Sequence, residues 1–244
     1  VALIKFNLLK LVIDFGNSQV KLALFCNKDL VATKKIKFFS RKEVIGFCGD
    51  ITISSSIYSK VRKLTASEQK LISSLNCVEL NKDTPLPISS MYESYVGSDR
   101  IAAVVGATFL FPNKDIWVFD AGSCLTADFI DKEKKYHGGR ITLGLKMRYK
   151  ALNDYTSDLP LINQQEHTPF KGENTKNSIV SGVQRGILSE VKTLMSEWKK
   201  ENKNFIVLFT GGDLSFFEKE LKSSIFADPF LVLKGLNEIL DYNE

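Results

Sequence analysis

The chain has 244 residues, of which 44% are hydrophobic and 25% are charged, and its formal net charge is +5. This is the balance of a globular protein, and it excludes disordered and collagen-like classes. The four cysteines show no C-x-x-C spacing and the chain has two histidines, so no zinc site built from these residues is expected.

The first half of the chain predicts a three-stranded meander followed by mixed α/β structure. Apolar runs bounded by turn residues predict strands over residues 8–15, 20–25, 31–38, 51–57 and 77–80. Helical spacing of apolar residues predicts a helix over 60–75. A loop with two prolines is expected over 81–94, and an apolar helix over 98–111.

The same arrangement then starts again. Strands are expected over 116–121, 125–130, 139–143 and 205–209, and helices over 146–152, 174–202, 214–222 and 229–240. The first strand of each half ends in an Asp-x-Gly turn, at Asp14 and at Asp120, which indicates an internal repeat. We therefore predict an α/β protein of two lobes, residues 1–113 and 114–244, each with a mixed sheet flanked by helices.

The two Asp-x-Gly turns have the composition of a phosphate site. Backbone N–H groups and hydroxyls in such a turn suit phosphate oxygens, and a carboxylate suits Mg²⁺. One turn alone would be read as a hairpin, but the duplication and the Gly211-Gly212 pair after a third strand favour phosphate binding. The residues concerned are Asp14, Gly16, Asn17, Ser18 and Lys21 in the first turn, and Asp120, Gly122, Ser123, Thr126 and Asp128 in the second.

Gly97-Ser98-Asp99-Arg100 stands at the start of the apolar helix and has two interpretations. In one, Ser98 caps the helix and Asp99 complements its dipole. In the other, Asp99 orients a substrate hydroxyl for attack on a γ-phosphate, in a loose transition state that depends mainly on alignment. The residues alone do not decide between the two.

Together these segments resemble the type III pantothenate kinases, whose fold belongs to the acetate and sugar kinase, actin and RNase H-like superfamily. The family motifs are D-x-G-N-[ST]-x-x-[KR], G-x-D-R, D-A-G-T-x-x-T-x-D and G-G-x-I-x-P-G, and they match residues 14–21, 97–100, 120–128 and 138–144. Asn174-Thr175 and Thr210-Gly211-Gly212-Asp213 also match, in the family's order. The resemblance implies a duplicated RNase H-like, actin-like ATPase fold.

The resemblance also implies a reaction: ATP-dependent phosphorylation of pantothenate to 4'-phosphopantothenate, the first step of coenzyme A biosynthesis. The implied cofactors are ATP, Mg²⁺ held by Asp14, and a monovalent cation, K⁺ or NH₄⁺, held by Asp120. Asp99 would be the base. The implied ATP contacts are Asp14, Phe15, Gly16, Asn17, Ser18, Gln19, Val20, Lys21 and Ser123, and the implied pantothenate contacts are Tyr92, Gly97, Ser98, Asp99, Arg100 and Thr175. A homodimer is expected, with Thr175 reaching the neighbouring subunit's site.

Three positions depart from the family pattern. Leu143 replaces a proline, and Ser123 replaces a threonine while keeping its hydroxyl. The spacing from Tyr92 to Gly97 is shorter than in the family, so Tyr95 is the alternative to Tyr92.

Two other functions compete with the pantothenate kinase. One is a non-catalytic accessory relative that binds nucleic acid or a regulatory partner, and the other is a kinase for a different small hydroxyl substrate. The lysine clusters at 34–37, 132–135 and 199–203 are interpreted as solvated faces, so nucleic acid binding is not expected. The longest apolar run, 101–111, is shorter than the roughly 18 residues of a membrane span. No membrane contact is therefore expected, and the four cysteines in apolar surroundings favour a reduced, cytoplasmic compartment. The carboxylates Asp14, Asp99 and Asp120 beside phosphate-type turns favour the kinase.

Overall fold

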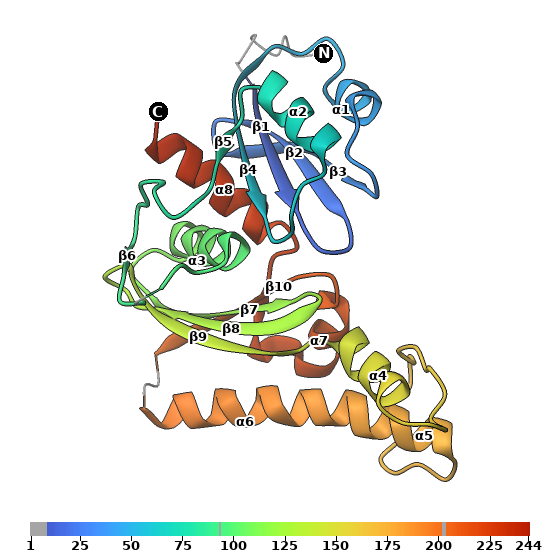
Figure 1. Ribbon diagram of the computed structural model, residues 1–244. Helices are drawn as coiled ribbons and strands as arrows, with labels where there is room; N and C mark the ends of the chain where they lie inside the picture. Colours follow the sequence, from blue (N-terminus) through green and yellow to red (C-terminus); the bar gives the residue numbers. More distant parts are fainter. Residues whose placement is uncertain (1–8, 93, 202–203) are drawn as a thin grey trace, which may run out of the picture. The chain divides into compact units, whose positions relative to one another are not determined.

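The computed structural model describes residues 9–92, 94–201 and 204–244 (Figure 1). The chain forms two compact units. The first unit runs to Pro112 and also takes in residues 134–136 and 230–244. The second unit consists of residues 113–133 and 137–229. Among the helices of the described ranges, none combines the length and the apolar character that crossing a bilayer would require.

The first unit is built on a five-stranded sheet in the order β3-β2-β1-β4-β5. Its strands are β1 (Leu9–Phe15), β2 (Val20–Cys26), β3 (Asp29–Ile36), β4 (Ile53–Lys60) and β5 (Val78–Glu79). The first three form the predicted antiparallel meander, and β4 pairs in parallel with β1. The residues from Leu11 to Phe15 are all buried, as expected for a central strand covered on both faces.

The helices of the first unit are α1 (Arg41–Cys48), α2 (Ala66–Ser74), α3 (Ser98–Leu110) and α8 (Leu231–Tyr242). The sequence predicted a helix from residue 60, but β4 continues to Lys60 and α2 begins six residues later. A capping box sets this start, because Thr65 accepts from the Glu68 N–H while the Glu68 carboxylate accepts from the Thr65 N–H. The short helix α1 was not predicted, since it buries only Val44 and Cys48.

Two glycines let α3 and α8 pack with their backbones in contact, and Figure 1 shows these helices (green and red) side by side. A Cβ atom added at Gly235 would lie 1.7 Å from the carbonyl oxygen of Ala102. One added at Gly106 would lie 2.6 Å from the carbonyl oxygen of Leu231. Through this packing, α8 belongs to the first unit. The division into lobes 1–113 and 114–244, which was made from the order of the elements along the chain, stays a prediction.

The six-stranded sheet has the order β11-β10-β7-β8-β9-β6. Its strands are β6 (Ser89–Ser90), β7 (Asp115–Ala121), β8 (Cys124–Ile130), β9 (Lys135–Leu143), β10 (Phe205–Thr210) and β11 (Phe226–Ala227). Here β7 pairs antiparallel with β8 and parallel with β10. In the first unit β1 pairs in the same way with β2 and β4, so the repeat inferred from the two turns is present in the strand pairing.

The helices of the second unit are α4 (Leu145–Asp154), α5 (Thr175–Val180), α6 (Gly186–Glu201) and α7 (Leu214–Leu221). A π-helical turn, Ser181–Arg185, joins α5 to α6. The long helix α6 lies along the sheet (Figure 1), where Trp198 stacks on Trp117 with ring centroids 3.3 Å apart. The predicted α/β class, with two mixed sheets and helices, is confirmed.

The close contact between α3 and α8 predicts that Gly235→Ala destabilises the protein. The added methyl group collides with backbone, which has to shift, so we expect the free energy of unfolding to fall by about 3 kcal/mol. Thermal unfolding should then occur roughly 6–12 °C lower. Gly186→Ala is the matched control, because nothing lies within 4 Å of its added Cβ. It should be neutral or stabilising, and a Gly235→Ala protein as stable as this control would contradict the packing.

Candidate active site

Asp14 lies between two polar residues of the neighbouring strands. In register, Lys21 on β2 stands on one side and Ser59 on β4 on the other. The Lys21 Nζ lies 3.2 Å from Asp14 Oδ2, and the Ser59 hydroxyl donates to Asp14 Oδ1 at 3.0 Å. Asp14 is only 4% exposed. A buried carboxylate needs such partners, and here they fix both of its oxygens in place.

The turn between β1 and β2 is exposed at its tip and anchored by buried residues on both sides. Asn17 and Ser18 are exposed, whereas the side chains of Phe15 and Val20 are buried. The ring of Phe15 packs against that of Phe39, with centroids 4.9 Å apart. Of the residues that the resemblance assigns to ATP, Phe15 and Val20 are therefore core residues, and their side chains support the turn from below.

The Gly97–Arg100 segment is joined to the end of β4 by the side chain of Ser98. The Ser98 hydroxyl accepts from the Lys60 N–H at 3.3 Å and donates to the Lys60 carbonyl at 3.0 Å. Lys60 follows Ser59, the partner of Asp14. The structure therefore brings the Asp14 turn and the start of α3 together within the first unit.

The interpretation of Ser98 as a helix cap is wrong. Gly97 occupies the N-cap position and no side chain caps this end, because Ser98 is already the first helical residue and bonds to Lys60. The next residue, Asp99, is partly exposed in the first turn of α3, and its Oδ1 accepts from the Arg100 N–H at 2.8 Å. A Cβ at Gly97 would lie 2.9 Å from this oxygen, so glycine leaves room for the carboxylate.

Arg100 is nearly buried, at 7% exposure, and its Nη2 donates to the hydroxyl of Tyr136 at 3.0 Å. Its guanidinium carbon lies 6.0 Å from the ring centroid of Tyr92, which is 40% exposed. Tyr95, the alternative aromatic residue, has a larger exposed fraction than Tyr92. The part of its side chain that is buried raises the pKa of its hydroxyl. Tyr92 is thus the one shown in ring contact with Arg100.

The second turn repeats the geometry of the first with different partners. Asp120 is the next-to-last residue of β7 and stands in register between Thr126 on β8 and Thr210 on β10. Gly211 has φ +104°, and a Cβ there would lie 2.5 Å from Asp120 Oδ1. A side chain at Gly211 would therefore displace this carboxylate. The residue after the glycine pair, Asp213, donates its backbone N–H to the Ala121 carbonyl at 2.8 Å.

Two further glycines pack β9 and its continuation against the hairpin of the second turn. A Cβ at Gly139 would lie 2.1 Å from the Ala127 carbonyl oxygen, and one at Gly144 would lie 2.3 Å from that of Ser123. Leu143, the residue in place of the family's proline, is 44% exposed. The G-G-x-I-x-x-G segment thus supports the D-A-G-S turn directly.

The remaining predicted residues also belong to the second unit. Ser123 is exposed at the turn, and Thr175 is the exposed first residue of α5, where the Asn174 side chain caps the helix.

Burial raises the pKa of the Asp213 carboxyl, and the positive charge of Lys146 opposes this shift. Within the described ranges no group of three or more His, Cys, Asp or Glu side chains is placed to hold a metal ion. Mg²⁺ in kinases commonly takes only one or two carboxylates, with substrate phosphates and water.

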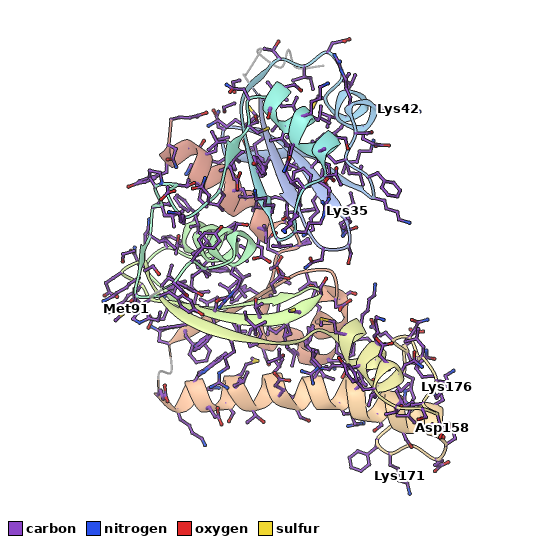
Figure 2. The ribbon with its side chains drawn as sticks, viewed as in Figure 1. Lys35, Lys42, Met91, Asp158, Lys171 and Lys176 are labelled. Carbon is purple, nitrogen blue, oxygen red and sulfur yellow. The ribbon has the colours of Figure 1, made fainter. Side chains whose placement is uncertain are left out.

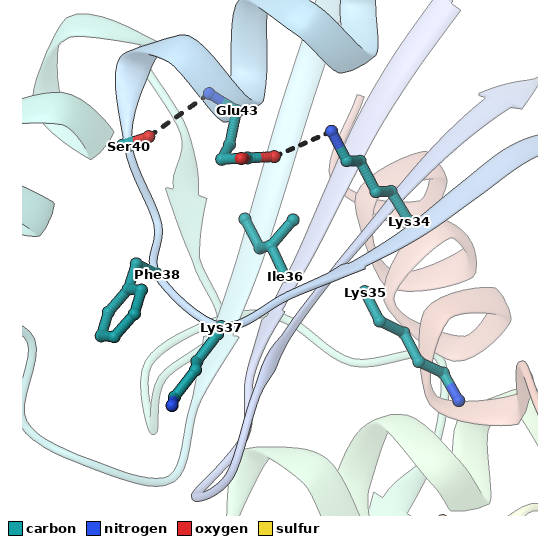
Figure 3. A pocket seen from close by; sticks show the side chains of 7 residues that line it. All are labelled: Lys34, Lys35, Ile36, Lys37, Phe38, Ser40 and Glu43. Atoms are coloured by element: carbon teal, nitrogen blue, oxygen red, sulfur yellow. Dashed lines mark hydrogen bonds and ion pairs between the residues drawn. The ribbon is translucent and has the colours of Figure 1, made fainter.

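A separate surface pocket of about 430 Å³ contains none of the predicted site residues (Figure 3). Its lining consists of Lys34, Lys35, Ile36, Lys37, Phe38, Ser40 and Glu43. Lys34 pairs with Glu43 at 2.8 Å, and Lys37 Nζ lies 5.5 Å from the ring centroid of the exposed Phe38. The first lysine cluster of the sequence thus lies on the surface of the first unit, around this pocket.

Comparisons with known proteins identify the family. A family model for type III pantothenate kinase matches residues 10–197. A type III pantothenate kinase of Phocaeicola vulgatus is 40% identical over 240 residues, which cover 97% of this chain and 99% of that protein. The chain belongs to the type III pantothenate kinase family. A Bacteroides fragilis member is also 40% identical, over 96% of this chain and 98% of its own length.

Solved structures show the fold. A Campylobacter jejuni protein described as a Baf family transcriptional activator has a TM-score of 0.63 at 23% identity, over 96% of this chain and 98% of its own. A ROK family glucokinase from Streptomyces griseus has a TM-score of 0.52 at 10% identity, over 96% and 98% of the two chains. The resemblance drawn from the motifs and the actin-like ATPase fold are both confirmed.

Proposed function

We propose that this chain transfers the γ-phosphoryl group of ATP to pantothenate, which yields 4'-phosphopantothenate and begins coenzyme A biosynthesis. Family membership over nearly the whole chain supports the reaction. The observation that carries the proposal is the link from Asp14 through Ser59 and Lys60 to Ser98. It brings a phosphate-type turn and a helix-start carboxylate, Asp99, together within the first unit, and transfer to a hydroxyl requires such positioning.

In this proposal the turn at 14–21 holds the ATP phosphates. The backbone of Gly16, Asn17, Ser18 and Gln19 supplies N–H groups, Lys21 supplies positive charge, and Ser123 adds a hydroxyl. Asp14 holds Mg²⁺, whose charge would neutralise the phosphate oxygens. Lys21 and Ser59 already aim the Asp14 carboxylate, so little reorganisation is needed on binding.

Asp99 is proposed to orient the primary hydroxyl of pantothenate and to accept its proton. Arg100 is the residue of the segment suited to the carboxylate of pantothenate, because a guanidinium pairs with that group in a planar, bidentate way. Tyr92 and Gly97 complete the pantothenate side, and Ser98 acts by holding the segment on Lys60. Thr175 is proposed to reach the site of the neighbouring subunit in a homodimer. Sedimentation analysis of the purified chain can detect this homodimer.

Replacement of the proposed base predicts loss of turnover with the fold retained. Asp99→Asn keeps the size of the side chain and its hydrogen bond from the Arg100 N–H. We expect kcat to fall by at least about 100-fold, because a positioned general base contributes on that scale. Phosphopantothenate is measured by mass spectrometry, with thermal unfolding as the check on folding. A fully active variant would rule out this role, and a wild-type protein that binds ATP without phosphorylating pantothenate would point to another hydroxyl substrate.

The Asp14 turn predicts a specific loss of nucleotide affinity. Asp14→Asn removes the charge proposed to hold Mg²⁺, so the Kd for Mg-ATP, measured by calorimetry, should rise by at least about tenfold. Glu238→Gln is the matched control, because this buried carboxylate pairs with Lys28 in the same unit and at another place. It should leave the Kd unchanged. Equal affinities of the wild type and Asp14→Asn would remove Asp14 from the nucleotide site.

Asp120 is proposed to hold the monovalent cation. Its neighbours in register are two residues with hydroxyl groups, Thr126 and Thr210. In the first sheet, Asp14 has the positively charged Lys21 as its neighbour on the antiparallel strand. A carboxylate among oxygen donors suits a hard cation such as K⁺.

The cation site predicts a dependence of turnover on potassium. We expect kcat of the wild type to be at least about tenfold higher in potassium than in sodium. Without its bound cation the site loses a positive charge that stabilises the phosphate, and losses of this kind lower kcat by at least that factor. Asp120→Asn should be equally slow in both salts. Asp131 follows β8, at the end of the β7–β8 hairpin opposite to the Asp120 turn, and pairs with His137. Asp131→Asn should keep the wild-type dependence of turnover on potassium. Equal wild-type rates in both salts would contradict the cation assignment and leave the kinase in place.

A further inference from the structure

Tyr136, the second residue of β9, is fully buried and belongs to the first unit. A buried phenol hydroxyl requires a hydrogen-bond partner, because its transfer from water would otherwise be costly. The structure supplies one in Arg100, whose Nη2 donates to this hydroxyl at 3.0 Å. The bond fixes one end of a guanidinium that is itself only 7% exposed.

The backbone of the same residue holds the segment that carries Tyr92. The Tyr136 carbonyl accepts from the Met91 N–H at 2.9 Å, and Ser90 pairs with Tyr136 in the parallel contact of β6 with β9. Met91, labelled in Figure 2, directly precedes Tyr92. The Tyr92 ring in turn lies 6.0 Å from the Tyr136 ring, at an interplanar angle of 35°.

The three side chains close a triangle. Arg100 contacts Tyr136 by a hydrogen bond, its guanidinium carbon lies over the Tyr92 ring, and the two rings contact each other. Arg100 comes from α3, Tyr92 from the loop after β6 and Tyr136 from β9. These segments lie far apart in the sequence, and Tyr136 touches both of the others. Phenylalanine would fill the same volume, so the hydroxyl contributes through its bond to Arg100.

We propose that Tyr136 is a positioning residue for pantothenate: its hydroxyl orients the Arg100 guanidinium, and its carbonyl holds the segment of Tyr92. This inference rests on the proposed function of the site. Arg100 and Tyr92 contact the substrate, and Tyr136 acts through them. Because a guanidinium recognises a carboxylate in one plane, a rotation of Arg100 weakens that recognition without moving the phosphate turn.

Tyr136→Phe tests the proposal, since it removes the hydroxyl and keeps the ring and the backbone. We expect the KM for pantothenate to rise by at least about tenfold, the scale of a hydrogen bond to a charged group. The change in kcat should stay within about threefold, and the KM for ATP should not change. Each variant is assayed at a temperature where circular dichroism shows it folded.

Two further variants separate positioning from a general loss of stability. Tyr149→Phe also removes a buried hydroxyl, which donates to Gln184 at 2.7 Å in the second unit. It should lower the unfolding temperature without changing the KM for pantothenate. Arg100→Lys should raise this KM, and adding Tyr136→Phe to it should raise the KM no further, because the two residues act as one unit.

An unchanged KM in Tyr136→Phe overturns the inference, as do equal increases in Tyr136→Phe and Tyr149→Phe or additive effects of Tyr136→Phe and Arg100→Lys. A wild-type protein without pantothenate kinase activity overturns the proposed function and this inference with it. An active wild type with an unaffected Tyr136→Phe overturns only the inference.

Discussion

The candidate site depends on the double hydrogen bond between the Ser98 side chain and the main chain of Lys60. A single hydroxyl, acting as donor and acceptor, satisfies both backbone groups of the residue that follows Ser59. Since Ser59 also holds Asp14, the end of β4 sets the distance between the phosphate-type turn and the start of α3. Ser98 is buried, and a buried hydroxyl is costly to leave unpaired, so this arrangement stabilises the fold while it positions the chemistry.

The duplicated halves use the same strand pairing for different electrostatics. In each, a central strand has an aspartate as its next-to-last residue, flanked by an antiparallel and a parallel neighbour. The first aspartate has an ammonium group and a hydroxyl beside it, and the second has two hydroxyl residues. The second turn is also surrounded by glycines at Gly139, Gly144 and Gly211, where a Cβ would meet a backbone atom within 2.5 Å. A shared scaffold can thus present one carboxylate already neutralised and another placed among oxygen donors.

Much of this could be predicted from the sequence. The strands up to residue 38, the Asp-x-Gly turns and the apolar helix that begins at Ser98 were predicted within about two residues, because buried runs and turn residues are local signals. What could not be predicted was pairing. Nothing local marks Ser59 as the neighbour of Asp14, or Tyr136 as the partner of Arg100, since both contacts depend on which strand lies beside which. The interpretation of Ser98 as a cap, one of two that the sequence left open, is wrong for the same reason, because its hydroxyl bonds to a residue 38 positions earlier in the chain.

The close packing of α8 on α3 has a consequence for synthesis on the ribosome. All residues of the second unit are made before α8, which supplies the missing wall of the first unit. The second unit can therefore fold while the chain is still growing. The face of α3 that packs on α8 stays uncovered until α8 has been made, although most of the first unit's own sequence was made before the second unit. The first unit is therefore completed after the second, although most of its residues are synthesised earlier.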